Sequence, residues 1–238
     1  MNAGLLVIIL LLGLAFLGFP IYIALGIGTL AALNMAGMPA LVLPQKLFAG
    51  MNSSSLLAIP FFILAGNIMS RSITVKLIDV ANAIIGWIRG SVAVVTVLAS
   101  ALFGAISGSG VATASAIGGI TIPAMQREGY PSEFSTAIAS ISSILGPIIP
   151  PSITLIVYAS ITNVSVSQLF MGSVIPGILL AGSLIVYALV YGKRKNLPAH
   201  EKQTPKQIGH AFKEGIWALL MPIIILGGIF GGIFTPTE

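Results

Sequence analysis

The chain has 238 residues, of which 56% are hydrophobic and 7% are charged, and it contains no cysteine. Its apolar stretches are too long for the core helices of a soluble domain, so the composition predicts an all-α polytopic membrane protein. The lack of cysteine excludes a disulfide framework or a thiolate metal site, and the basic residues behind the net charge of +5 lie in a few loops, where they set membrane orientation rather than bind nucleic acid.

Apolar patterning predicts about six transmembrane helices. Glycine and proline at positions 18–20 separate the first two, and a polar connector with two prolines and Lys46 covers residues 37–53. A capping-box pattern at Ser165 to Gln168 precedes the fifth span, and a second such pattern stands at Thr204 to Gln207. The second of these patterns is expected to begin a short amphipathic helix within a soluble loop at 196–214. The predicted spans are residues 5–18, 21–35, 56–69, 132–162, 169–191 and 217–234.

Residues 71–89 have a different pattern. Lys76, Asp79, Asn82 and Arg89 recur every three or four residues, which leaves the apolar residues largely on the other faces. This pattern predicts an amphipathic helix lying in the membrane interface and anchored by Trp87. The alternative is a short crossing helix with charged ends.

Two interruptions divide the apolar sequence that follows. The small residues Ser107, Gly108, Ser109 and Gly110 stand in the middle of residues 90–126, and we expect a re-entrant helical hairpin that turns there. The run from Gly146 to Pro151 contains three prolines, which remove backbone donors and break the fourth span. Two broken apolar elements in succession point to the binding site of a transporter.

The placement of charge predicts the orientation. The first five predicted spans are crossings, and the hairpin returns to the side that it enters from, so residues 71–89, 127–130 and 193–214 lie on the same side. These segments hold every lysine and arginine except Lys46. By the positive-inside rule this side is cytoplasmic, the N-terminus is external and the hairpin enters from the cytoplasm.

The hairpin tip allows two kinds of ligand. Free N–H groups and helix dipoles at Ser107 to Gly110 favour a carboxylate, whereas the Ser107 hydroxyl with the carbonyls of Gly146, Ile149 and Pro150 would form an oxygen cage for Na⁺. The alternative is that these small residues only permit tight helix packing.

Enzymatic functions are not expected. Both histidines, His200 and His210, lie in the predicted soluble loop, so a membrane serine has no base near it, and Asp79 is the only aspartate. No charged residue lies at the predicted membrane centre, which favours coupling to Na⁺ through neutral oxygens over coupling to protons. We expect no organic cofactor.

Six motifs in this order resemble the large membrane subunit of TRAP (tripartite ATP-independent periplasmic) transporters, a DctM-like protein. The resemblance runs from end to end of the chain. In that family the subunit is about twice this length, and the final motif leads into a second, inverted half. The motifs are GFPI (18–21), LLAIPFFILAGNIM (56–69), LFGAISGSGVATASAIG (102–118), PAMQREGY (123–130), LGPIIPPS (145–152) and GIFTPTE (232–238).

The resemblance implies the first half of an inverted-repeat, elevator-type transporter in the bacterial inner membrane. It implies Na⁺-coupled uptake of organic acids such as C4-dicarboxylates or sialic acid, with a small membrane subunit and a periplasmic solute-binding protein as partners. It places the first Na⁺ site on Ser107, Gly146, Ile149 and Pro150, and the substrate beside the hairpin tip.

The expected domains follow from the same resemblance. They are scaffold helices with an interfacial arm helix (1–90), a transport-domain hairpin and broken helix (91–163), a transmembrane helix (164–195), a cytoplasmic loop (196–215) and the first helix of the second repeat (216–238). Two alternatives remain open at this point. One is another elevator-type anion symporter, and the other is a non-transporting structural or channel-like membrane protein.

Overall fold

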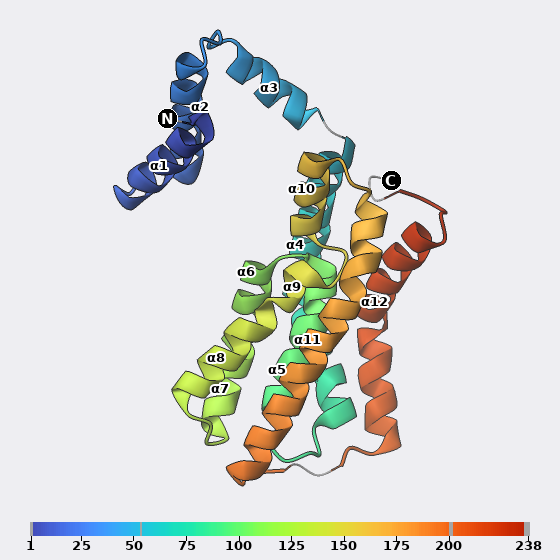
Figure 1. Ribbon diagram of the computed structural model, residues 1–238. Helices are drawn as coiled ribbons and strands as arrows, with labels where there is room; N and C mark the ends of the chain where they lie inside the picture. Colours follow the sequence, from blue (N-terminus) through green and yellow to red (C-terminus); the bar gives the residue numbers. More distant parts are fainter. Residues whose placement is uncertain (1, 53, 200–201, 236–238) are drawn as a thin grey trace. The chain divides into compact units, whose positions relative to one another are not determined.

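The computed structural model describes residues 2–52, 54–199 and 202–235. The chain divides into two compact units, residues 1–53 and 54–238. Throughout the described ranges the regular structure is helical, as the composition predicts (Figure 1).

The first unit contains three helices. The helices α1 (Ala3–Phe16) and α2 (Ile21–Met35) are separate, as predicted, and they pack against each other at Gly28, where an added Cβ atom would lie 3.4 Å from the Val7 carbonyl oxygen. The predicted connector is only partly irregular, since it contains a third helix, α3 (Val42–Met51). Its Pro44 lies in the first turn, where a missing N–H costs little.

The second unit is built around α5 (Ser91–Ser107), of which nearly every residue is buried. The chain turns at Gly108 and returns through α6 (Gly110–Thr113), the π-helix η1 (Ala114–Gly118) and α7 (Gly119–Arg127). The return leg runs back along α5, since the Thr96 hydroxyl of α5 lies 4.0 Å from the Met125 sulfur of α7. The two legs form a helical hairpin with its turn where the sequence predicts it, while its re-entrant course in the membrane stays a prediction.

The predicted fourth span is broken, as expected. It consists of α8 (Ser132–Ser143), α9 (Leu145–Ile148) and α10 (Ile153–Thr162), with a bend of 46° between the part ending at Ile148 and α10. The break brings α9 against the far end of α5.

The prediction of a separate interfacial helix at 71–89 is wrong in its boundary. One helix, α4 (Ser54–Ile85), includes both the predicted third span and most of this segment. The local sequence around Arg71 contains no glycine or proline, so nothing there ends the helix. The buried residues Leu77, Ile78 and Ala81 face the protein core rather than lipid.

Two long helices complete the unit. The helix α11 (Val166–Arg194) begins at Ser165, whose hydroxyl accepts the Gln168 N–H at 3.5 Å as predicted. The helix α12 (Pro205–Phe230) begins with the predicted capping box of Thr204 and Gln207. The expected short amphipathic helix is not separate, because α12 continues without a break into the predicted last span.

Length and composition identify two to four candidate membrane spans in the described residues. The helices α11 and α12 each suffice alone, and the broken pair α8–α10 is long enough as one bent crossing. The helices α1 and α2, with 14 and 15 residues, are shorter than the ~20 residues of a full crossing. The chain is therefore a multi-pass helical membrane protein, while the count of about six spans and the domain boundaries stay predictions.

Parts of the three basic segments lie together at one end of the second unit. Arg89 donates a hydrogen bond of 2.9 Å to Asn196, and Phe134 stacks on Tyr191 with ring centroids 3.7 Å apart. The end of α4, the α7–α8 turn and the α11–α12 connection thus meet at the lower end of the unit in Figure 1. This grouping agrees with the prediction that all three face the same side of the membrane.

Candidate functional site at the hairpin tip

The hairpin tip is a two-residue turn between α5 and α6. Gly108 adopts the left-handed conformation (φ +60°) that glycine takes without strain, and its N–H bonds the Gly104 carbonyl at 2.8 Å. Ser109 then caps α6, because its hydroxyl accepts the Ala112 N–H at 3.3 Å. The sequence Ser-Gly-Ser-Gly therefore ends one helix and begins the next within four residues.

The break in the second element is an extended segment between α9 and α10. Ile149 is extended, and the Pro150–Pro151 peptide bond is cis. Ser152 bridges the break: its hydroxyl accepts the Leu155 N–H at 3.3 Å and donates to the Pro147 carbonyl at 2.7 Å. This hydroxyl partly compensates for the donors that the prolines remove.

The tip and the break are in direct contact. The Gly108 carbonyl accepts the Ile153 N–H at 3.3 Å, and a Cβ atom on Gly108 would lie 2.9 Å from the Pro151 carbonyl oxygen. Only glycine fits at this position, because both the space and the backbone conformation exclude a side chain. The two irregular segments that the sequence singles out thus form one junction.

A cluster of neutral oxygens lies at this junction. The Ser107 hydroxyl lies 3.3 Å from the Thr113 hydroxyl and 3.4 Å from the Ser109 carbonyl, and Thr113 donates to that carbonyl at 2.8 Å. Both side chains are buried, Ser107 being 5% exposed and Thr113 0%. Within the described ranges no group of three Asp, Glu, His or Cys residues could hold a metal ion. Any cation here would therefore rely on hydroxyl and carbonyl oxygens.

Gly146 closes the cluster from the side of the broken helix. A Cβ atom built on it would lie 2.9 Å from both the Ser109 carbonyl oxygen and the Thr113 hydroxyl oxygen. The structure thus brings together Ser107 and Gly146, two of the four residues expected to bind Na⁺. For the other two, the structure packs the Ile149 side chain near Gly177 of α11 and buries Pro150, and their role as ligands stays a prediction.

Thr113 is the residue that sequence reasoning missed. It stands four residues after Ser109, so that one helical turn places its hydroxyl over the Ser109 carbonyl. This spacing indicates the contact of Thr113 with Ser109, but it does not indicate the contact with Ser107.

A pocket of about 580 Å³ opens beside the oxygen cluster. Ser107 and Ser109 line it, together with Asn67 of α4 and Ser115 of η1. Gly108 and Gly110, also expected to bind substrate, lie against the broken helix, where Gly110 approaches the Ser143 carbonyl. None of the described residues that line this pocket is charged, so a bound anion would be held there by N–H and O–H groups or by a bound cation.

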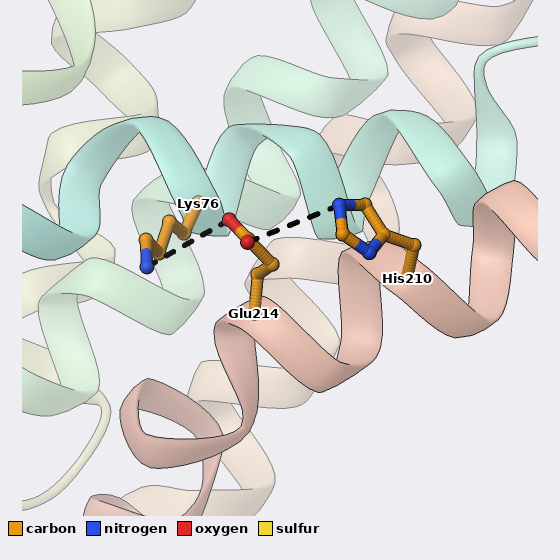
Figure 2. Close-up of polar contacts among 3 residues, drawn as sticks. All are labelled: Lys76, His210 and Glu214. Carbon is orange, nitrogen blue, oxygen red and sulfur yellow. Dashed lines mark ion pairs between the residues drawn. The ribbon is translucent and has the colours of Figure 1, made fainter.

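A second pocket, of about 750 Å³, lies at the basic end of the unit. Glu214 of α12 stands between Lys76 of α4, at 3.8 Å, and His210, also at 3.8 Å (Figure 2). Partial burial, and secondarily the charge of Glu214, raises the pKa of Asp79, which also lines this pocket. The side chains of Lys76, Glu214 and His210 are 40%, 52% and 74% exposed, so their ion pairs contribute little to stability.

Comparison with known proteins identifies the family. Residues 7–238 match the family model described as "Tripartite ATP-independent periplasmic transporter, DctM component". The chain is 43% identical to a C4-dicarboxylate TRAP transporter large permease protein of Vibrio cholerae, over 98% of this chain and 52% of that protein. It is 38% identical to the 2,3-diketo-L-gulonate permease of Escherichia coli and to the ectoine permease of Halomonas elongata, in both cases over 96% of this chain and 54% of the relative.

The chain spans about half the length of the curated relatives that it matches. The family consists of transporters and not enzymes, which confirms that no catalytic site should be expected. The match over nearly the whole chain shows that it belongs to the DctM component family of tripartite ATP-independent periplasmic transporters.

Proposed function

We propose that this chain forms part of the large permease subunit of a TRAP transporter that takes up an organic acid together with Na⁺. The observation that carries the proposal is the junction of the hairpin tip with the broken helix, where Gly108 meets Pro151 and Ile153. In transporters, helices broken at mid-membrane supply carbonyl oxygens to ions and N–H groups to anions.

Na⁺ is proposed as the coupling ion because of the chemistry of the cluster. Ser107, Ser109 and Thr113 supply neutral oxygens, and hard cations bind several such oxygens. Gly146 contributes by leaving room for the approach of these oxygens, and its carbonyl with those of Ile149 and Pro150 would complete the set. A proton-coupled site would instead need an ionisable side chain.

The substrate would bind beside the ion. The described residues that line the pocket next to Ser107 and Ser109 carry no charge, and a bound Na⁺ would supply the positive charge that an organic anion needs there. The names of the relatives support an organic acid or a similar polar solute, since they include transporters for C4-dicarboxylates, 2,3-diketo-L-gulonate and ectoine. C4-dicarboxylates and sialic acid are the substrates to test first.

The proposed setting is the bacterial inner membrane. The chain would act with a small membrane subunit and a periplasmic solute-binding protein, and would move its hairpin and broken helix as an elevator against scaffold helices. The hairpin would be re-entrant, with its base at the basic, cytoplasmic end and its tip about 25 Å away along the 17 residues of α5.

Uptake by proteoliposomes that contain the complete transporter, with its binding protein outside, tests the proposal. We expect uptake of the organic acid to require an inward Na⁺ gradient. Replacing external Na⁺ with choline should abolish uptake, and a proton gradient should not restore it. Uptake of equal rate in choline, driven by a proton gradient, would contradict Na⁺ coupling.

A further inference from the structure

Ser91, Ser100 and Ser142 are buried helix residues whose hydroxyls have no hydrogen-bond partner among the described residues. Ser91 begins α5, whereas Ser100 and Ser142 are the two that lie near the contact between Gly104 and Gly146. The hydroxyls of Thr96, Thr121 and Ser135 donate to a carbonyl one turn earlier, at 2.8–2.9 Å. Within the described ranges, the hydroxyls of Ser100 and Ser142 have no hydrogen-bond partner, although these residues are 1% and 0% exposed. A buried hydroxyl without a partner is costly and needs an explanation.

The two serines lie at matching positions on neighbouring helices. Gly104 of α5 and Gly146 of α9 are in backbone contact, since a Cβ atom on Gly104 would lie 2.7 Å from the Gly146 Cα. Ser100 stands one turn before Gly104, and Ser142 stands one turn before Gly146. Ile144, between Ser142 and Gly146, is in helical conformation. Residues four apart share a helix face, so both serines face the seam between α5 and α8.

The direction of the helices supports this register. Met125 near the end of α7 lies beside Thr96 near the start of α5, and α8 begins shortly after α7 ends. At the other end, Gly146 just beyond α8 contacts Gly104 near the end of α5. The helices α5 and α8 therefore run side by side in the same direction, and Ser100 and Ser142 stand at the same level of the seam.

The hairpin's return leg passes the same level. Gly110 approaches the Ser143 carbonyl at its upper end, and Gly118 approaches Ala139 lower down. The π-helix η1, which ends at Gly118, is a rare geometry that is frequent at functional sites. The return leg beside this seam thus departs from regular helix geometry.

We propose that Ser100 and Ser142 together hold one buried water molecule at the seam between α5 and α8, beside η1. A buried water makes about three hydrogen bonds to polar groups that would otherwise be unsatisfied, which matches two hydroxyls and a neighbouring carbonyl. Two hydroxyls are too few oxygens for a Na⁺ ion, which distinguishes this position from the cluster at the tip.

The bound water fixes the register of the two halves of the proposed ion site. Ser107 lies two turns beyond Ser100 on α5, and Gly146 lies one turn beyond Ser142. A slip of α5 along α8 would therefore separate the Ser107 hydroxyl from Gly146. Ser100 and Ser142 are positioning residues, and this consequence rests on the proposed Na⁺ coupling.

A double-mutant cycle on thermal unfolding of the purified complete transporter tests the shared water without reference to transport. We expect Ser100→Ala and Ser142→Ala each to lower the Tm by ~2–4 °C. The double variant should lose no more than the worse single variant, because the first substitution already removes the water. Ser135→Ala is the matched control, since it is equally buried on the same face of α8 but bonds its own helix. The proposal would be overturned if the losses in Tm were additive in the double variant. It would also be overturned if Ser135→Ala, combined with Ser100→Ala, showed the same non-additivity as Ser142→Ala.

A density map of the complete transporter, recorded in Na⁺ and again in choline, identifies the occupant. We expect a peak within hydrogen-bond distance of both hydroxyls that is equally strong in both salts. A peak that disappears in choline would mean a Na⁺ ion, and directly bonded hydroxyls would mean no bound molecule; either result overturns the water site.

Uptake tests the consequence for the ion. Each single variant should raise the Na⁺ concentration for half-maximal uptake, and Ser135→Ala should leave it unchanged. An unchanged value in both variants would remove the positioning role. A transporter that shows no Na⁺ dependence in its unmodified form would instead contradict the proposed function, while the thermal cycle would still decide on the water.

Discussion

Gly104 is a residue at which the backbones of α5 and the broken helix are in close contact. A Cβ atom there would lie 2.7 Å from the Gly146 Cα and 2.9 Å from its backbone nitrogen, and neither backbone atom can move aside cheaply. We expect Gly104→Ala to destabilise the protein by about 1–3 kcal/mol, the usual cost of overpacking a close contact. Chemical unfolding in detergent, followed by tryptophan fluorescence, measures this loss.

Gly182→Ala is the control for Gly104→Ala. Gly182 also lies inside a helix, but a Cβ atom added to it would meet no other atom within 4 Å. This variant should be neutral or gain roughly 0.5–1 kcal/mol from the lower backbone entropy of alanine. Equal stability of the two variants would show that the glycine contact does not hold the helices together.

At the scale of elements, an aromatic stack fastens the start of α8 to the end of α11. Tyr130 stacks on Phe134 at 5.6 Å, and Phe134 stacks on Tyr191 at 3.7 Å. Tyr130 lies in the α7–α8 connection, and burial together with the charge of Glu128 raises its pKa to about 12. The neutral phenol is therefore the form that the fold favours.

This pKa predicts a loss of stability in alkali. Because the pKa is raised above the ordinary value of about 10, the contribution of Tyr130 is complete below pH 10 and is lost as the pH rises from about 10 to about 12. Tyr130→Phe should remove this part of the alkaline decline in Tm, and Tyr187→Phe in the same stack should retain it. Identical alkaline profiles for Tyr130→Phe and the unmodified protein would contradict the assignment.

Local chemistry made part of this fold predictable. The turn at Gly108 and the break after Ile148 follow from glycine and proline in the sequence itself, and so do the caps at Ser165 and Thr204. The continuous course of α4 and α12 was not predicted, because charged residues indicate a change of environment but do not end a helix.

Contacts between distant residues were predictable only in part. The sequence suggests that Ser107 and Gly146 meet, since both occupy interruptions at comparable depth. It does not reveal that Thr113 joins them, because this depends on how the return leg is rotated against α5. The contact of Gly104 with Gly146 likewise depends on the packing of α5 against α9.

At the scale of the whole molecule, the basic residues predict how the chain lies in the membrane. We expect the N-terminus outside and the connection between α11 and α12 in the cytoplasm, because the basic segments at 71–89, 127–130 and 193–214 belong on the cytoplasmic side. Cysteines introduced singly at Asn2 and Gln203 should react with a membrane-impermeant reagent from opposite sides of intact cells. Reaction of both from the same side would refute the predicted number of crossings between them.

The central claim is that the hairpin tip and the broken helix together hold Na⁺. Its most direct test is the Na⁺ concentration for half-maximal uptake by the complete transporter carrying Ser107→Ala. Loss of one hydroxyl ligand should raise this concentration about tenfold, the effect of removing one hydrogen-bonding group from a charged partner, with unchanged abundance in the membrane. The control Ser183→Ala removes an exposed hydroxyl that bonds its own helix, and it should change nothing. If Ser107→Ala and Ser183→Ala both retain the Na⁺ dependence of the unmodified protein, the Ser107 hydroxyl is a packing group and the ion binds elsewhere.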